Sequence, residues 1–242
     1  MKPLALVTGA GTGIGKAICL ALLKRDCAIL AAGRRADVLT TLQKENPDRI
    51  FVVASDVSTS NGRQTLIDAL PAGYDLTYVV HNAGVITPVG PLSSLTEAAW
   101  RKHMAINAEA PLFLTQALMP HMKSGRILHI SSGAAHFPII HWTPYCTSKA
   151  ALFMIYECLK LEFKQSHIHF ASIMPGIADT PMQDTIRAFS PTQFPDVKRF
   201  QAYKAKKELV CADKVGEFIA HLLLDVSAEI YSEKEWDIYD HL

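Results

Sequence analysis

Short apolar runs that alternate with helix-like segments constrain the fold of this chain more than any other feature of its sequence. Most of these runs are mainly apolar, as strands are when both faces of a sheet are buried. Such strands, separated by helices, predict a parallel sheet covered on both sides. The predicted strands are 4–8, 27–32, 50–55, 76–83, 125–132, 168–174 and, at the edge, 236–239. The clearest helical patterns are 13–25, 97–122, 145–165 and 213–224.

The length of the chain predicts a single α/β domain over 1–242. With 242 residues and 49% hydrophobic content, the chain can bury a sizeable core but is short for two domains. Right-handed crossovers then give a doubly wound, seven-stranded, mostly parallel sheet, whose ligands bind beyond the carboxyl ends of the strands. The segment 176–206 has several prolines and weak periodicity. We expect it to be a substrate flap, with an ordinary surface insertion as the alternative.

Composition excludes several classes of function. The 24 basic and 23 acidic residues nearly balance, so nothing indicates nucleic acid or an anionic membrane surface as a partner. The five cysteines are odd in number and form no C-x-x-C pair, which is typical of a reduced protein without disulfides or structural zinc. No apolar run approaches the roughly 18 residues of a membrane span. We therefore expect a cytoplasmic protein, and no metal site, because His136 and His141 lack partners at metal-ligand spacing.

A glycine-rich turn, "VTGAGTGIG", lies between the first predicted strand and the first predicted helix. Glycines at such a turn let the backbone approach a pyrophosphate at a helix N-terminus, where free N–H groups and the helix dipole favour anions. The spacing is G-x-x-x-G-x-G rather than the usual G-x-G-x-x-G. Its position favours dinucleotide binding by Gly9, Thr12, Gly13, Ile14 and Gly15.

The end of the second strand indicates which dinucleotide binds. An acid there would accept a hydrogen bond from a ribose 2′-hydroxyl, whereas arginine accommodates a 2′-phosphate. Gly33 occupies the place of the acid, and Arg34 and Arg35 follow. We predict NADP(H), with Arg34 as the main contact and NAD(H) as the alternative. After the third strand, Asp56 and Val57 are expected to bind the adenine. The competing explanation is that Asp56 caps the next helix, and the two roles are compatible.

Tyr145 and Lys149 are four residues apart in "YCTSK", one helical turn. Free tyrosine has a pKa near 10, too high for efficient proton transfer at neutral pH. Residues at this spacing have Cβ atoms about 5–6 Å apart, and a cation at about 4–6 Å lowers a pKa by roughly 1–3 units. The spacing alone predicts a tyrosine acid activated by lysine. By itself, however, Tyr-x-x-x-Lys occurs by chance in many helices.

The motifs together resemble the short-chain dehydrogenase/reductase family over nearly the whole chain. They occur in the order typical of that family: "TGAGTGIG" (8–15), "SDV" (55–57), "HNAG" (81–84), Asn107, "ISS" (130–132), "YCTSK" (145–149) and "PGIADT" (175–180). Each motif is weak alone, but seven in order are specific. The resemblance implies a Rossmann fold and hydride transfer between nicotinamide and a carbonyl or alcohol.

The resemblance also implies a role for each matching residue. Tyr145 is the acid/base, and Lys149 lowers the pKa of Tyr145 and binds the nicotinamide ribose. Ser132 holds the substrate oxygen with Ser131 as its structural neighbour, and Asn107 binds a water in a proton relay. The alternatives are that Asn107 only kinks its helix and that the serines only end a strand. The remaining implied dinucleotide contacts are Asn82, Ala83, Gly84, Pro175, Gly176, Ile177 and Thr180.

The substrate segment "ISSGAAHFPIIHWTPYC" is similar to the sepiapterin reductase and benzil reductase branch. That similarity implies a small ketone, a diketone or a pterin-like carbonyl. An apolar pocket is expected from His136, Phe137, Trp142, Met182 and Phe189, with plain core packing as the alternative for Trp142. Two features depart from the family: His81 precedes "NAG", and the C-terminus is acidic and aromatic rather than glycine-rich.

Two other functions remain open from the sequence. A 3-oxoacyl-carrier-protein reductase would need a basic docking patch, which only Lys198, Arg199, Lys204, Lys206 and Lys207 offer. A non-catalytic, dinucleotide-sensing regulator would have no need of Ser132, Tyr145 and Lys149. The helix at 145–165 has apolar residues on more than one face, and the resemblance implies a homodimer or homotetramer formed through it.

Overall fold

The described strands form one parallel sheet in the order β3-β2-β1-β4-β5-β6-β7, which confirms the predicted fold class. The structure is a computed structural model that describes residues 2–241. The strand order reverses direction between β1 and β4, and ligands of such sheets bind at this switch point. The strands are β1 (Lys2–Thr8), β2 (Ala28–Gly33), β3 (Ile50–Ala54), β4 (Tyr74–His81), β5 (Gly125–Ile130), β6 (Ile168–Met174) and β7 (Trp236–Asp237).

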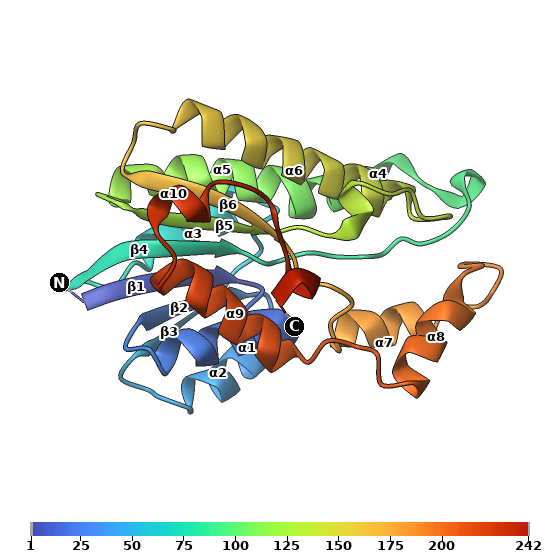
Figure 1. The fold of residues 1–242 in the computed structure, drawn as a ribbon, viewed down its shortest axis with the longest axis horizontal. Coiled ribbons are helices and arrows are strands. Elements are labelled where there is room, and N and C mark those ends of the chain that lie inside the picture. The colour runs from blue at the N-terminus through green and yellow to red at the C-terminus, as the bar shows by residue number, and fades with distance from the viewer. Residues whose placement is uncertain (1, 242) are drawn as a thin grey trace.

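Helices cover both faces of the sheet (Figure 1). One face carries α1 (Gly13–Leu23), α2 (Ala36–Gln43) and α9 (Ala212–Leu224), and the other carries α3 (Ser60–Asp68), α4 (Glu97–Met104), α5 (Ala110–Leu118) and α6 (Thr143–Glu162). The short helix α10 (Ala228–Tyr231) precedes β7. Along β1, Ala5 and Val7 pack into one core while Leu4 and Leu6 pack into the other, and all four are buried. The two-sided burial explains why the strands are apolar throughout.

The helix predicted over 97–122 is interrupted, which corrects its boundaries. A π-helical turn at Ala105–Glu109 separates α4 from α5, and a 3-10 turn at Met119–His121 ends the segment. Pro111 lies in the first turn of α5, where a missing N–H costs little. The edge strand is also shorter than the predicted 236–239, because residues 238–241 form a 3-10 turn.

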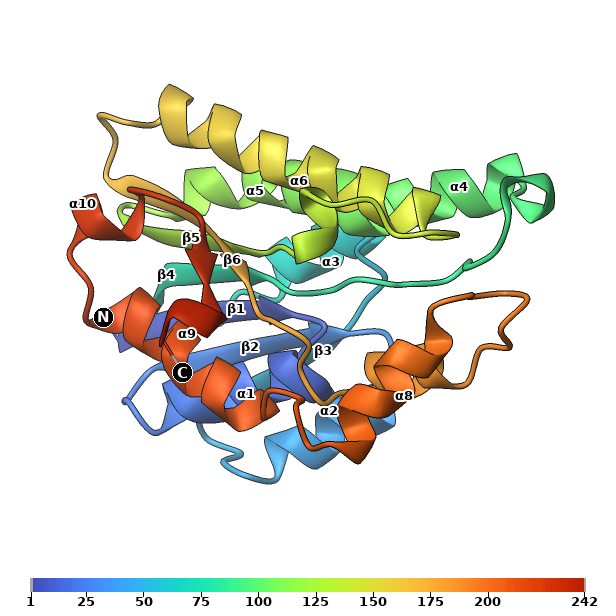
Figure 2. The same cartoon turned by 45° about the vertical axis from the view of Figure 1, so that its right-hand side comes forward.

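The segment 176–206 contains two helices, α7 (Pro181–Arg187) and α8 (Val197–Ala205). They stand beyond the carboxyl ends of the strands, away from the two helical layers (Figures 1 and 2). The segment returns to the body through a parallel bridge between Ala178 and Val210. Its function as a flap stays a prediction. Within residues 2–241, no helix has both the length and the apolar character that crossing a membrane requires.

Candidate active site

A cavity of about 980 Å³ opens at the carboxyl ends of the strands. It brings together nearly all of the residues predicted from the sequence to form the site. Gly15 and Asn107 do not line it; they contact residues that do. The predicted residues that line it are Gly9, Thr12, Gly13, Ile14, Arg34, Arg35, Asp56, Val57, Asn82, Ala83, Gly84, Ser132, Tyr145, Lys149, Pro175, Gly176, Ile177 and Thr180.

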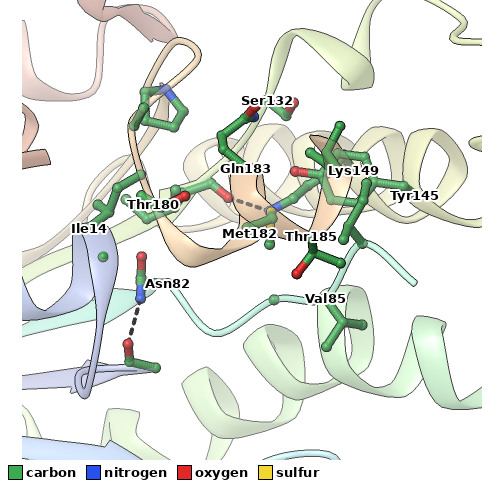
Figure 3. Close-up of a pocket in the computed structure, with 18 of the residues that line it drawn as sticks. Ile14, Asn82, Val85, Ser132, Tyr145, Lys149, Thr180, Met182, Gln183 and Thr185 are labelled. Atoms are coloured by element: carbon green, nitrogen blue, oxygen red, sulfur yellow. Dashed lines mark hydrogen bonds between the residues drawn. The ribbon is translucent and has the colours of Figure 1, made fainter. Parts of the chain in front are cut away.

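The glycine turn is fastened to the segment that follows β4. Asn82 Nδ2 donates to the carbonyl oxygens of Thr8, at 2.9 Å, and Gly9, at 3.2 Å, and Figure 3 shows Asn82 beside this turn. A Cβ atom on Gly15 would lie 2.3 Å from the Gly9 carbonyl oxygen, so the first turn of α1 can approach β1 this closely only with glycine. Gly9 itself has φ +65°, a left-handed conformation that favours glycine. The sequence therefore shapes a tight backbone cradle at the N-terminus of α1.

Basic side chains gather at the end of β2. Arg34 and Arg35 both line the cavity and are exposed, and Arg35 Nη2 donates to Thr12 Oγ1 at 3.4 Å. Gly33 ends the strand, so no carboxylate stands at its tip. This end of the cavity presents two cations beside the glycine turn, an arrangement suited to a phosphate group.

Asp56 does not cap the following helix, so that alternative interpretation was wrong. Thr59 is the N-cap of α3 and accepts from the Gly62 N–H. Asp56 Oδ1 instead accepts from Ser58 Oγ, at 2.7 Å, and from Ser58 N, at 3.0 Å. The hydrogen bond from the Ser58 side chain is the main reason that the pKa of Asp56 is lowered, with Arg34 contributing. The carboxylate stays charged at the cavity wall.

Ser132, Tyr145 and Lys149 lie together at the other end of the cavity (Figure 3). Ser132 follows β5 and begins a 3-10 turn over Gly133–Ala135, where its Oγ accepts from the Ala134 N–H at 3.2 Å. Tyr145 and Lys149 project from the first turns of α6 and are both buried. The Lys149 Nζ donates to the Ile130 carbonyl oxygen at 2.6 Å and lies 5.8 Å from the centroid of the Tyr145 ring.

The effect of Lys149 on Tyr145 differs from the prediction. Burial is the dominant influence and raises the pKa of Tyr145 to about 12, while a hydrogen bond with the Ser132 side chain lowers it. Burial also lowers the pKa of Lys149 to about 8, with the charge of Glu235 opposing that change. The spacing places the two groups one turn apart as predicted. The protein environment, however, leaves the phenol protonated and the ammonium easily deprotonated.

Asn107 joins three elements. Its Oδ1 accepts from the Val85 N–H at 2.9 Å, and its Nδ2 lies 3.0 Å from both the Val85 carbonyl oxygen and Ser148 Oγ. The side chain of Asn107 thus holds the loop after β4 against α6. The π-helical turn that contains Asn107 directs it inward, so the kinking role and the contact coexist. The water-binding role stays a prediction.

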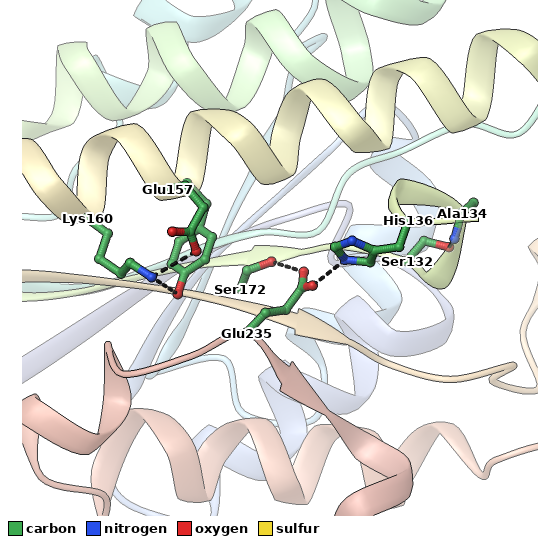
Figure 4. Close-up of polar contacts among 8 residues, drawn as sticks. Ser132, Ala134, His136, Glu157, Lys160, Ser172 and Glu235 are labelled. Carbon is green, nitrogen blue, oxygen red and sulfur yellow. Dashed lines mark hydrogen bonds and ion pairs between the residues drawn. The ribbon is translucent and has the colours of Figure 1, made fainter. Parts of the chain in front are cut away.

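The C-terminal segment joins the site in a way that the sequence did not indicate. The Glu235 side chain is 8% exposed, accepts from Ser172 Oγ at 2.7 Å, and lies 2.6 Å from His136 Nε2 (Figure 4). His136 follows the Ser132 turn, so Glu235 fastens that turn to β6. Further along, the Tyr239 hydroxyl accepts from the Ile177 N–H at 3.0 Å, a backbone group among the predicted dinucleotide contacts. In the sequence, only the acidic residue just before the edge strand could have indicated that the C-terminal segment contacts the site.

Other predicted residues lie elsewhere. His136 and Phe189 do not line the cavity, whereas Phe137, Trp142 and Met182 do, so the predicted pocket is corrected at the first two positions. His81 is buried, stacks on His129 with 5.1 Å between ring centroids, and bonds Thr115 Oγ1 at 2.8 Å. Among the described residues, no group of three or more His, Cys, Asp or Glu side chains is placed to hold a metal ion.

The doubly wound sheet, the glycine cradle and the buried tyrosine–lysine pair define an oxidoreductase of the dinucleotide-binding α/β class. The model of the short chain dehydrogenase family matches residues 3–191, and the chain belongs to this family. The predicted resemblance is therefore confirmed.

Known proteins support the assignment. A benzil reductase ((S)-benzoin forming) of Bacillus cereus is 30% identical over 230 residues, covering 90% of this chain and 92% of the relative. The crystal structure of the KRED1-Pglu enzyme is 34% identical with a TM-score of 0.88, covering 96% of this chain and 99% of that one. An angucycline C-6 ketoreductase with bound NADP is 25% identical with a TM-score of 0.81, covering 97% of this chain and 92% of that one.

Proposed function

We propose that the chain is an NADP(H)-dependent reductase of small ketones and 1,2-diketones. The observation that carries this proposal is the placement of Ser132, Tyr145 and Lys149 at one end of a cavity whose other end holds Arg34 and Arg35. A donor pair for a carbonyl oxygen and a cationic site for a phosphate are thus joined by one continuous space.

The residues of the cavity fit a dinucleotide. A Cβ atom on Gly9 would lie 2.9 Å from both Ala83 Cα and Asn82 Nδ2, so only glycine lets the turn pack this closely on the segment after β4. The N-terminus of α1 beside this turn is suited to a pyrophosphate. Arg34 and Arg35 are suited to the 2′-phosphate that distinguishes NADP(H), since arginine offers several donors in a fixed fork. The structure of the NADP-bound ketoreductase relative supports the same choice. Asp56 and Val57 are suited to the adenine, and Lys149 and Thr180 to the nicotinamide end.

The protein's own groups then complete the reduction. The bound dinucleotide supplies the hydride that adds to the carbonyl carbon. Ser132 Oγ donates a hydrogen bond to the carbonyl oxygen and fixes its position, and the Tyr145 hydroxyl gives its proton to the same oxygen. The Lys149 ammonium stabilises the phenolate that remains, because an opposite charge nearby favours the ionised form. Burial raises the pKa of Tyr145 to about 12, so the phenol is protonated before the reaction. It gives up its proton because the carbonyl oxygen becomes strongly basic as the hydride adds.

The substrate end of the cavity supports a ketone with an apolar body. A buried cluster that includes Ile86, Trp142, Ile186 and Phe200 packs beside Tyr145, and all four residues line the cavity. The name of the Bacillus cereus relative supports an aromatic diketone as the first compound to try. Exposed Met154 and Leu161 on α6, and Phe113 on α5, support a homo-oligomer formed through these helices. A cytoplasmic location remains part of the proposal and agrees with the five unpaired cysteines.

A kinetic comparison of Tyr145→Phe with the unchanged protein tests the proposed function. We expect the unchanged protein to oxidise NADPH faster than NADH in the presence of benzil. Removing the proton donor is expected to lower kcat by about 100-fold or more. Absorbance of the reduced dinucleotide measures the rate.

Tyr156→Phe is the matched control. Tyr156 is a second buried tyrosine of α6, and its hydroxyl bonds only Lys160 among the described residues, so its loss should leave kcat within about twofold. Equal turnover by Tyr145→Phe would remove the proposed acid. Acyl thioesters assayed in parallel test the carrier-protein alternative, and the absence of turnover with every carbonyl would favour the regulator.

A further inference from the structure

His103 is a buried histidine of α4 that does not line the cavity but contacts two residues of the site. The residue is 1% exposed, and its ring meets the ring of Tyr145 edge-to-face, with 6.1 Å between the centroids. Its Nδ1 lies 3.2 Å from the Thr87 carbonyl oxygen, and its Nε2 lies 2.8 Å from Asn107 Nδ2. Each ring nitrogen thus has a specific partner.

The partner of Nδ1 decides which nitrogen of His103 carries the hydrogen. A carbonyl oxygen can only accept, so Nδ1 must be the donor in the bond to Thr87. A neutral imidazole has a single N–H, and its second nitrogen is then an acceptor. Burial, helped by the charge of Lys149, lowers the pKa of His103 and keeps the ring neutral, although the bond to Thr87 opposes that change. Nε2 therefore accepts a hydrogen bond from the amide of Asn107.

The amide of Asn107 cannot satisfy every acceptor around it. Its Nδ2 has two hydrogens. Three acceptors among the described residues lie within hydrogen-bond distance: the Val85 carbonyl oxygen at 3.0 Å, Ser148 Oγ at 3.0 Å and His103 Nε2 at 2.8 Å. Val85 holds one side of the amide through two bonds, because its N–H also donates to Asn107 Oδ1 at 2.9 Å. The second hydrogen is left for His103 or Ser148, and the shorter distance favours His103.

Asn107 in turn lies close to Lys149. A Cβ atom on Gly84 would lie 3.5 Å from Asn107 Oδ1 and 3.9 Å from Lys149 Nζ, so both polar atoms face the same point beside Gly84. Reversing the amide would turn its N–H groups toward the ammonium, and two donors do not bond each other. The direction of the Asn107 amide therefore decides whether an acceptor or a donor stands beside Lys149.

We propose that His103 is a positioning residue for the reduction and acts through Asn107. This inference rests on the proposed function. By accepting one N–H of Asn107, the imidazole keeps Oδ1 directed toward the Val85 N–H and the space beside Lys149. Without an acceptor at that place, Ser148 becomes the alternative partner and the amide shifts toward α6. Small displacements at a reacting centre lower turnover strongly, because the reaction tolerates little misplacement.

Two amide variants separate the roles of the two nitrogens of His103. Glutamine reaches the position of Nε2 and keeps an acceptor for Asn107, whereas asparagine reaches only the position of Nδ1 and keeps a donor for Thr87. With benzil and NADPH, we expect kcat to fall about tenfold or more in His103→Asn, and by at most about threefold in His103→Gln. The KM for NADPH should stay within about twofold of the value for the unchanged protein, because His103 does not line the cavity.

Two further measurements complete the design. His121→Asn, at an exposed histidine beyond α5, is the control and should leave kcat unchanged. Nitrogen NMR of the isotope-labelled unchanged protein, with the signals of His103 assigned through its backbone, reports which ring nitrogen carries the hydrogen. We expect the neutral form with the hydrogen on Nδ1 at about pH 7.5. This measurement keeps the test intact if a His103 variant folds poorly.

Equal kcat in the two amide variants, or a larger loss in His103→Gln than in His103→Asn, would overturn the inference while leaving the proposed function in place. A raised KM for NADPH with unchanged kcat would do the same. A hydrogen on Nε2 in the unchanged protein would also overturn the inference, because Nε2 could then not accept from Asn107. If the unchanged protein reduced no carbonyl with NADPH, the proposed function would fail first and the inference with it.

Discussion

At the scale of single residues, Lys149 carries a positive charge into the core, and burying that charge lowers the stability of the fold. The residue is 5% exposed, and its ammonium is bonded only to the Ile130 carbonyl oxygen among the described residues. Burial accordingly lowers its pKa from about 10.5 to about 8. A buried charge of this kind destabilises the folded protein. The proposed function explains why the chain keeps it, because the ammonium takes part in catalysis.

Lys149→Met should therefore make the protein more stable at pH 7, while abolishing activity. The variant avoids the burial of a charge but loses the bond to Ile130, and we expect a net gain of about 1–2 kcal/mol in the free energy of unfolding. Between about pH 8 and 10.5 the unfolded state of the unchanged protein binds more protons than the folded state. The stability of the unchanged protein consequently rises with pH over that window. The stability advantage of Lys149→Met should therefore become smaller toward pH 10.5.

Urea denaturation at pH 7 and pH 9.5 measures both free energies. Lys164→Met, an exposed lysine just beyond α6, is the control and should bring no comparable gain. A variant that is less stable at pH 7, or whose advantage grows toward pH 9.5, would show that the charge is not costly to bury.

At the scale of elements, residues 235–239, which include β7, support both halves of the site. Glu235 bonds His136 and Ser172, and Tyr239 bonds the Ile177 N–H. Ile238 and Trp236 anchor the segment in the core beneath these contacts. A C-terminal end without the usual glycines therefore has a specific use here: its polar side chains hold the Ser132 turn and the loop after β6.

Glu235→Gln should narrow the pH range of activity. The Glu235 carboxylate raises the pKa of Lys149, so its removal lowers that pKa below about 8. Since the proposed reaction needs the ammonium, activity should be lost at a lower pH than in the unchanged protein. We expect the ratio of kcat/KM at pH 8.5 to that at pH 6.5 to fall by about twofold or more.

Glu233→Gln, on the exposed side of the same segment, provides the control and should leave the pH profile unchanged. A uniform loss of activity at all pH values in Glu235→Gln would mean that the carboxylate only holds the turn. In that case its charge would have no influence on Lys149.

The elements also show what sequence can predict. Six strands are mainly apolar and were located close to their observed bounds, and the edge strand was located but is shorter than predicted. The motifs at the strand ends located the cavity. The π-helical turn at 105–109 was missed, because the hydrogen bond that its Asn107 makes joins it to Val85, which is distant in sequence. The unexpected pKa of Tyr145 arises from burial, which the four-residue spacing does not reveal. Glu235 was missed because its partners, His136 and Ser172, are distant from it in sequence.

At the scale of the whole molecule, the structure has a compact body and an outlying pair of helices. The helices α7 and α8 meet the body through the bridge between Ala178 and Val210 and through the apolar cluster around Trp142. Phe194 and Phe200 from this part of the chain pack on Trp142, with ring centroids 5.1 and 5.5 Å away. Residues 181–205 thus rest on the same tryptophan that lines the substrate end of the cavity.

Binding of NADP⁺ should therefore protect residues 181–205 from amide hydrogen exchange. Thr180, Pro181 and Arg199 line the cavity, so a dinucleotide in it would contact both ends of this segment. A part of the chain with few connections to the core opens more easily than the sheet, and added contacts should suppress that opening. We expect slower exchange in α7 and α8 by about tenfold, and little change in α10, which lies away from the cavity.

Mass spectrometry of peptides from both regions, with binding confirmed by calorimetry, measures the difference. Equal exchange in 181–205 with and without bound NADP⁺ would identify these helices as a fixed surface insertion rather than a flap.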